Sequence, residues 1–395
     1  MAVCELLKLS CCSASDFLFK PLLLRNKLIV PALILSILFS YCSKNVDVEP
    51  TSIEAEVQSS ATVEHPFQQR WKTQLQKLRK KGTSLRKTEK YIKLPGRTPG
   101  KAVAPTTCSF TPLTTVVDNY FAPFEFWDYI LYSDYIWINQ LSAIVDDSKQ
   151  YFGRKGEYNN AVAKQERKLK SFFSTPITPR IKGQHSETLD NRKKVAQVFM
   201  LFTGASAEDG YYIADQIIAM NAESKVFPES PLLSMDAFAT EDGIIVLGDG
   251  LIASLVKTGI SSDIVITALL AHEWAHLVQY ANMKKWYGYT TATMPQTAEF
   301  TRQLELEADF LAGYFLTHKR GATYNWKRVE QFNKLFFNLG DCSFESVGHH
   351  GSPAQRQKAS MLGYTVADQT MPRGHILTVD KLHAHFMQKR AGVLK

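Results

Sequence analysis

Apolar residues recur at helical spacing along much of this chain, and strand-like alternation is rare. An aromatic-rich block over residues 120–137 predicts a helix packed on the core, because large aromatic stripes are usually buried. Residues 188–222 also carry apolar positions three and four apart, with Gly204 and Gly210 as expected interruptions. These patterns predict a mainly helical protein.

Further along, one short segment is typical of a strand and two longer ones of helices. Ile244–Leu247 is a run of four apolar residues directly after a glycine. Ser261, Ser262 and Asp263 are good N-cap residues before the apolar stretch Ile264–Leu270. The amphipathic stretch Ala298–His318 is closed by a basic pair and a glycine. We therefore predict an α+β fold, mainly α, with a small mixed sheet.

The charge of the 395-residue chain is distributed unevenly. The formal net charge is +8, but residues 1–107 contain 17 basic and 8 acidic side chains, which leaves 29 basic and 30 acidic for the rest. The apolar fraction of 45% is that of a folded protein. A nearly neutral folded part argues against nucleic acid as a partner.

The N-terminal segment has the features of an export signal. Arg25 and Lys27 precede an apolar run, Leu28–Tyr41, of about 14 residues, whereas a spanning helix needs roughly 20. Cys42 and the polar residues after it resemble the lipidation site of a bacterial lipoprotein, although Tyr41 stands where a small residue is usual. Residues 1–42 are thus a lipoprotein signal, an ordinary cleaved signal or a short anchor. We expect export to the cell envelope, with the membrane contacted through this N-terminal part.

A tether is predicted between this signal and the folded domain. Residues 43–107 are polar and then basic, and 70–101 hold 12 Lys and Arg against the single acid Glu89. The basic stretch is either an amphipathic helix for anionic lipid or a solvated linker. Residues 108–395 form the predicted catalytic domain, in which Cys108 and Cys342 are either a disulfide or two buried thiols.

The motif that carries chemistry is His272-Glu273-Trp-Ala-His276. On a helix, positions i and i+4 share a face, so both imidazoles can bind one Zn²⁺ while Glu273 lies beside the water that the metal activates. By chance, roughly one in a hundred chains of this length and composition would contain such a motif. It therefore predicts a zinc site in which Glu273 is the general base for hydrolysis.

Catalytic zinc needs a third protein ligand and an open position. Glu305 and Asp309 lie one turn apart on the second predicted helix, and no His follows the motif closely. If that helix crosses the first, Glu305 can reach the metal and Asp309 can accept the outer N–H of a ligand histidine. The alternative is that Glu305, Glu307 and Asp309 form a solvated acidic face.

Taken together, these motifs resemble the HtpX and CAAX-prenyl-protease-like gluzincins and related neutral zinc metallopeptidases. Glu-x-x-Ala-Asp after HExxH is similar to the family motif, in which the Glu is the third ligand and the Asp supports a histidine. Met235–Leu247 is similar to a family segment with Asn where this chain has Asp236. The resemblance covers about residues 190–365. It implies a zincin-like domain that binds one Zn²⁺ and cleaves polypeptides.

Two further expectations concern residues around the predicted metal. His350-Gly-Ser-Pro-Ala-Gln-Arg356 resembles a downstream family segment, so His350, or its neighbour His349, is expected to stabilise the developing oxyanion. Arg356 is expected to pair with a buried carboxylate; surface histidines are the alternative. Ile244–Leu247 is expected to be an edge strand that holds extended substrate.

Two rival functions stay open beside the peptidase. The first is a catalytically silent or chaperone-like envelope protein that uses the zinc fold to bind unfolded chains. The second is a purely structural zinc site, which is disfavoured because such sites usually have four protein ligands and this one has three.

Overall fold

A computed structural model describes residues 108, 110–227, 229–342, 344, 348–372 and 374–394. The predicted signal 1–42, with Cys42, and the tether 43–107, with its basic stretch, lie outside this range. Among the described helices, none has both the length and the apolar character that a membrane crossing demands.

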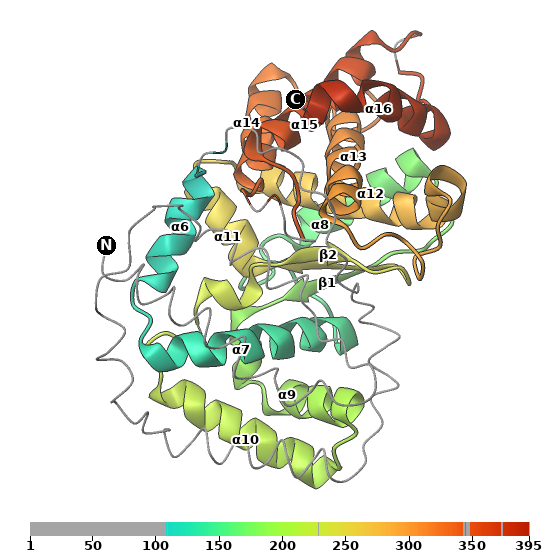
Figure 1. Cartoon of the computed structure of the whole chain (residues 1–395). Helices are drawn as coiled ribbons and strands as arrows, with labels where there is room; N and C mark the ends of the chain where they lie inside the picture. The colour runs from blue at the N-terminus through green and yellow to red at the C-terminus, as the bar shows by residue number, and fades with distance from the viewer. Residues whose placement is uncertain are drawn as a thin grey trace, which may run out of the picture.

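A three-stranded mixed sheet lies at the centre of the described chain (Figure 1). Its strands are β1 (Arg180–Gln184), β2 (Ala237–Ala239) and β3 (Ile244–Gly248), in the order β1-β3-β2. β1 runs parallel to β3, and β2 runs antiparallel to it. The predicted small mixed sheet and mainly helical architecture are confirmed.

The expectation that Ile244–Leu247 is an edge strand is wrong. This segment is β3, which is buried along its length and paired on both sides. The second neighbour of β3 is β1, which could not be recognised as a strand in the sequence because most of its residues are polar. Lys182 of β1 is buried, and its ammonium donates to the backbone carbonyls of Ile144 and Asp146 at 2.8 and 2.9 Å. The edge next to the metal-site helix is β2.

One layer of helices covers the sheet on the side of α7 (Figure 1). It comprises α6 (Pro112–Phe121), α7 (Phe126–Val145), the 3₁₀ turn η3 (Ser186–Asp190), α9 (Arg192–Val198), the π-turn η4 (Phe199–Thr203), α10 (Ala207–Glu223) and the 3₁₀ turn η5 (Pro231–Ser234). The aromatic block packs on the core, as predicted, but it is not the single helix expected: Tyr120 lies at the end of α6, and the rest of the block begins α7 after a break at residues 122–125.

The two glycines expected to interrupt the 188–222 pattern act differently. Gly204, with φ of 70°, ends η4 in the left-handed conformation that glycine adopts without strain. Gly210 lies inside α10 and interrupts nothing. A side chain there would meet Met200 and the carbonyl of Ala196, so its absence allows α10 to pack closely on α9 and η4.

The second layer of helices contains both predicted metal-site helices. It comprises α8 (Asn159–Phe173), α11 (Asp249–Lys257), α12 (Ser262–Tyr287), α13 (Ala298–Thr317), α14 (Trp326–Asn338), α15 (Pro353–Gln369) and α16 (Val379–Leu394). α12 starts after Ser261, as predicted, and ends at Gly288, whose φ of 79° is left-handed. α12 packs on β2 and β3, and α13 packs on α12.

Close packing of α13 on α15 depends on glycines. A Cβ at Gly313 would collide with the backbone carbonyl of Ser360, and one at Gly363 with that of Phe310. The helix that carries Glu305 is therefore held between α12 and α15.

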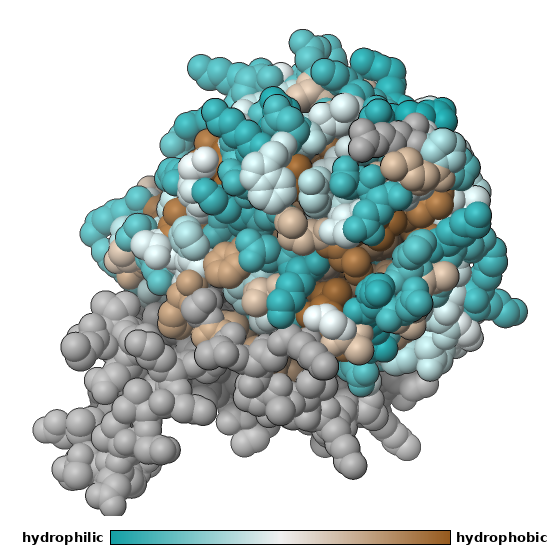
Figure 2. All heavy atoms as spheres, turned by 90° about the horizontal axis from the view of Figure 1, so that it is seen from above, coloured by the Kyte–Doolittle hydropathy of each residue, from teal (hydrophilic) through white to brown (hydrophobic). Residues whose placement is uncertain are grey.

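Cys108 and Cys342 form a disulfide, the first of the two alternatives for this pair. It joins the start of the domain to the segment just after α14. The face of the molecule seen from above is mainly hydrophilic, and hydrophobic atoms show there chiefly in a depression near its middle (Figure 2).

Candidate metal centre

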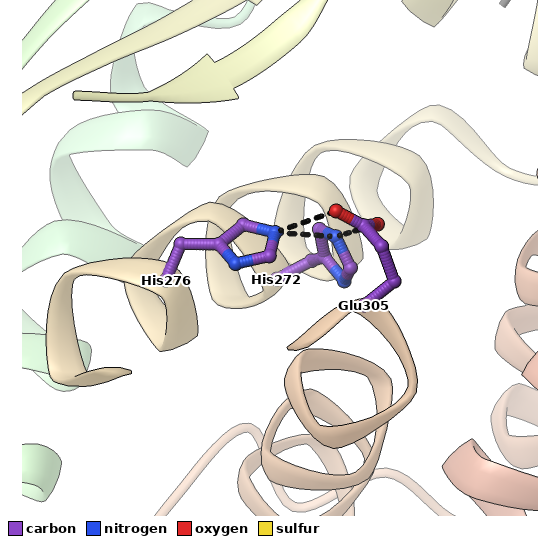
Figure 3. A group of neighbouring side chains, drawn as sticks. All are labelled: His272, His276 and Glu305. Atoms are coloured by element: carbon purple, nitrogen blue, oxygen red, sulfur yellow. Dashed lines mark hydrogen bonds and ion pairs between the residues drawn. The ribbon is translucent and has the colours of Figure 1, made fainter. Parts of the chain in front are cut away.

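Three side chains from two crossing helices converge on one point (Figure 3). His272 and His276 stand one turn apart on α12, and Glu305 reaches them from α13. The two Nε2 atoms are 3.1 Å apart, and the Glu305 carboxylate oxygens lie 3.3 Å from each of them. The three side chains predicted as ligands are thus brought together.

Their spacing allows the three side chains to share one ion. Zinc binds imidazole nitrogen and carboxylate oxygen at about 2.0–2.1 Å, which places tetrahedral ligand atoms about 3.3 Å from one another. The two Nε2 atoms are 3.1 Å apart, and each lies 3.3 Å from a different Glu305 oxygen, Oε2 for His272 and Oε1 for His276, so the three side chains are close enough to share one ion. Two histidines and one carboxylate are also a donor set of catalytic zinc sites, which keep one position open.

Asp309 links a ligand histidine to a buried arginine. Its Oδ1 lies 2.9 Å from His272 Nδ1, on the side of the ring away from the other ligands. Arg356 of α15 donates to both Asp309 oxygens, from Nε and Nη2, at 2.8 Å each. Asp309 is fully buried and Arg356 is 3% exposed. The arrangement places a carboxylate next to the outer nitrogen of His272, and Arg356 neutralises that carboxylate.

Carboxylates around His272 change its proton affinity. Burial lowers the pKa of His272, but Asp309 and Glu305 more than offset this and raise it to about 10. For Glu305, burial acts to raise the pKa, yet the nearby His350 and His276 hold it well below the usual range. A metal ion that binds here displaces a proton from His272, so affinity falls as the pH is lowered.

The second ligand histidine is oriented by a glutamine that the sequence reasoning missed. His276 Nδ1 lies 2.8 Å from Gln279 Oε1, and Gln279 Nε2 donates to the Leu304 carbonyl at 2.9 Å. Gln279 is fully buried. Its position three residues after His276, on the same helix face, is the signal from which it could have been found.

Glu273 lies in the same buried region but has no role in holding the ligands. It is 4% exposed, and its Oε2 makes no hydrogen bond. Burial raises the pKa of Glu273, while the positive charges of His272 and His276 act to lower it. A buried carboxylate oxygen without a donor costs stability, which favours a chemical role over a structural one.

The two histidines after α14 are held by one carboxylate, Asp341. It receives the backbone N–H of His350 at 2.8 Å and lies 2.6 Å from His349 Nδ1. Burial lowers the pKa of His350, but Glu305 and Asp341 raise it overall. His350 therefore lies within the electrostatic reach of Glu305, whereas His349 is fully buried against Asp341. Surface histidines, the alternative for this pair, are excluded.

The alternative of a solvated acidic face on α13 is also wrong. Glu305 has a side chain 12% exposed, and Glu307 and Asp309 are fully buried. Glu307 belongs to a separate group, here called the Glu307 cluster, that consists of Tyr287, Glu307 and His383. Tyr287 Oη donates to Glu307 Oε2 at 2.5 Å, and His383 Nδ1 lies 2.7 Å from Oε1.

His383 anchors α16. Its ring stacks on Trp286 of α12, with centroids 4.6 Å apart and planes inclined by 8°. The pairing joins α12, α13 and α16, and no local pattern in the sequence signals it. The chain that surrounds the metal centre consequently extends beyond the expected core of 190–365, to β1 on one side and α16 on the other.

Comparison of the chain with protein-family models, with curated proteins and with solved structures found no match. The functional inference therefore depends on the geometry of the metal centre and on the motif resemblance.

Proposed function

We propose that this protein is a zinc-dependent metalloendopeptidase of the gluzincin type, with a zincin-like catalytic domain. The observation that carries the proposal is the convergence of His272, His276 and Glu305 on one point, next to Glu273, a buried carboxylate with an unbonded oxygen. A structural site would be closed by a fourth protein ligand. Among the described residues, no fourth His, Cys, Asp or Glu joins this ligand group.

His272, His276 and Glu305 would hold the ion, and Zn²⁺ bound there would supply a Lewis acid and lower the pKa of water to about 7. Asp309 and Gln279 would keep the two imidazoles in the tautomer that leaves Nε2 free for the ion. Arg356 would balance the charge of Asp309.

Glu273 would take a proton from the attacking water and later deliver one to the leaving amine. Its raised pKa suits a group that must accept and release a proton near neutral pH. His350, with its raised pKa, would supply positive charge or a hydrogen bond to the oxyanion that develops on the substrate carbonyl.

The edge strand β2 is suited to hold an extended peptide. Asp236 and Thr240 bond inward to β3, at Gly248 and Ile244, so by alternation the backbone groups of Ala237 and Ala239 point to the outer edge. The Tyr280 hydroxyl of α12 donates to the Ala239 carbonyl at 3.5 Å, which ties this edge to the metal-site helix. A substrate strand added here would pass close to Glu273.

The test is Glu273→Gln, assayed with an unfolded casein-like substrate and measured for zinc content. We expect kcat to fall by about 10²–10⁴-fold with one zinc per chain retained, because the amide cannot accept the proton. Exposed Glu330→Gln, on α14, is the matched control and should behave as wild type. Full cleavage by Glu273→Gln, or a wild type that binds no zinc, would contradict the proposal.

The silent, chaperone-like alternative makes a different prediction in the same experiment. If Glu273→Gln lost cleavage but still replaced the wild-type protein in a deletion strain, binding of unfolded chains would be the main function. Export with lipidation of Cys42 is a separate proposal, and mass determination of the mature N-terminus tests it.

A further inference from the structure

A buried arginine next to the metal centre has no acceptor in the protein. Arg302 of α13 exposes 2% of its surface, and its Nε–H makes no hydrogen bond. Among the described residues, none forms a hydrogen bond or ion pair with this guanidinium. A buried N–H donor without an acceptor costs stability, so such a group points to an acceptor that the chain itself does not supply.

A second arginine, on α16, acts on Arg302 through its charge. Arg390 also has a buried Nε–H with no acceptor, and the two positive charges are close enough to repel each other. Burial lowers the pKa of Arg302, and the charge of Arg390 lowers it further. An anion placed between two such groups would relieve both the missing hydrogen bonds and the repulsion.

The nearby carboxylates are already engaged. Glu299 accepts from Arg390 Nη2 at 3.0 Å and is largely exposed. Asp341 accepts the backbone N–H of His350 and lies 2.6 Å from the ring of His349. Both carboxylates act on Arg302 through charge alone.

The position of Arg302 relates it to the metal centre. It precedes Glu305 by one turn of α13, a rise of about 4.5 Å along the helix axis. Asp341 lies close to both Arg302 and the metal centre. Its negative charge acts on the pKa of Arg302, and its carboxylate accepts the backbone N–H of His350, whose charge in turn lowers the pKa of Glu305. An extended peptide advances about 3.3 Å per residue, so a substrate at the metal can reach Arg302 within a few residues.

We propose that Arg302, assisted by Arg390, forms a subsite for a carboxylate of the polypeptide substrate close to the scissile bond. This inference rests on the proposed peptidase function and adds a substrate preference to it. The bidentate geometry of a guanidinium suits either an Asp or Glu side chain or a free C-terminal carboxylate.

The test compares matched peptides that differ only by Glu or Gln at each position within three residues of the cleaved bond. At one position the zinc-loaded wild type should cleave the Glu peptide about tenfold faster in kcat/KM, as expected for a charged hydrogen bond. Arg302→Met should bring this ratio close to one, and Arg302→Lys should restore part of it. Exposed Arg154→Met is the control and should keep the wild-type ratio. Peptides with a free or amidated C-terminus identify which carboxylate is bound.

Thermal unfolding supplies a measurement that does not depend on activity. Because Arg302 has no partner in the free protein, Arg302→Met should melt at or above the wild-type temperature. A fall of about 5 °C or more would mean that the arginine has a structural partner, and would overturn the proposal. A Glu-to-Gln ratio near one at every position and at the C-terminus, or one unchanged in Arg302→Met, would overturn the subsite alone. If the wild type cleaves no peptide, the peptidase function itself is wrong, and the subsite falls with it.

Discussion

The candidate metal centre and the Glu307 cluster contain the same kinds of side chain, histidines and buried carboxylates. They differ in how many of their polar atoms form hydrogen bonds. Both lie between α12 and α13, and both bring histidine to a buried carboxylate. In the Glu307 cluster each carboxylate oxygen has one donor group, at 2.5 and 2.7 Å. In the metal centre two imidazole nitrogens and a carboxylate meet at one point, and Glu273 beside them has an unbonded oxygen.

This difference indicates function better than burial does. Glu307 is fully buried and Glu305 is not, yet the arrangement around Glu307 is that of a structural anchor for α16. Two imidazole nitrogens and a carboxylate that converge on one point can exchange a bound proton for a cation, even though Arg356 Nη2 also lies 3.5 Å from His272 Nε2 and 3.6 Å from Glu305 Oε2. The two carboxylates, two residues apart on one helix, can therefore be separated by experiment.

The largest effect is expected from breaking the buried ion pair between Asp309 and Arg356. Asp309→Asn leaves Arg356 buried without its counter-charge and weakens the support of His272. We expect unfolding stability to fall by about 3–5 kcal/mol and zinc affinity to fall by about 10–100-fold. Urea unfolding in chelator and zinc competition measure the two quantities. A stability change under about 1 kcal/mol would contradict this account of the pair.

The comparison itself is tested by Glu305→Gln against Glu307→Gln. Glu305→Gln should lose zinc on dialysis because a ligand is removed. Glu307→Gln should keep one zinc per chain but lose about 1–3 kcal/mol of stability, because buried bonds from Tyr287 and His383 are weakened. Zinc content by atomic emission and unfolding in urea give the two readouts. If both variants lost zinc alike, the distinction between centre and cluster would be wrong.

The smallest effect is expected at Gln279, which orients His276 without touching the metal. Gln279→Ala should weaken zinc binding about tenfold, since the His276 N–H loses its acceptor. Gln279→Glu, the matched control, keeps an oxygen for that N–H and should bind zinc nearly as tightly as wild type. Chelator competition measures both affinities. Equal losses in the two variants would show that the Leu304 contact matters more than the histidine contact.

The ligands were predictable because they depend on local geometry. The spacing of His272 and His276 on a helix places both rings on one face, and the i, i+4 spacing of Glu305 and Asp309 does the same on the second helix. The boundaries of α12 and α13 follow from N-cap residues and a terminal glycine that are visible in the sequence.

The remaining features depend on packing between distant segments. β1 was not predicted because Arg180–Gln184 has no apolar alternation, and its pairing converted the expected edge strand into the central one. The same limit applies to Asp341 and to His383, whose partners lie 8 and 76 residues away and are specified by no period in the chain. Arg302 is a polar residue in an amphipathic helix, and only the packed structure shows that it is buried.

The disulfide between Cys108 and Cys342 has a consequence if the proposed peptidase function holds, because such an enzyme can also cut its own chain. It spans a sequence separation of 234 residues, so α6 through α14 form one covalent ring, with α15 and α16 as a tail. The loop 288–297, which connects α12 to α13 and in which no residue is buried, lies inside that ring. A single self-inflicted cut there would open the ring into a longer linear molecule instead of releasing a fragment. Nicked protein would separate into two bands on a gel only after reduction.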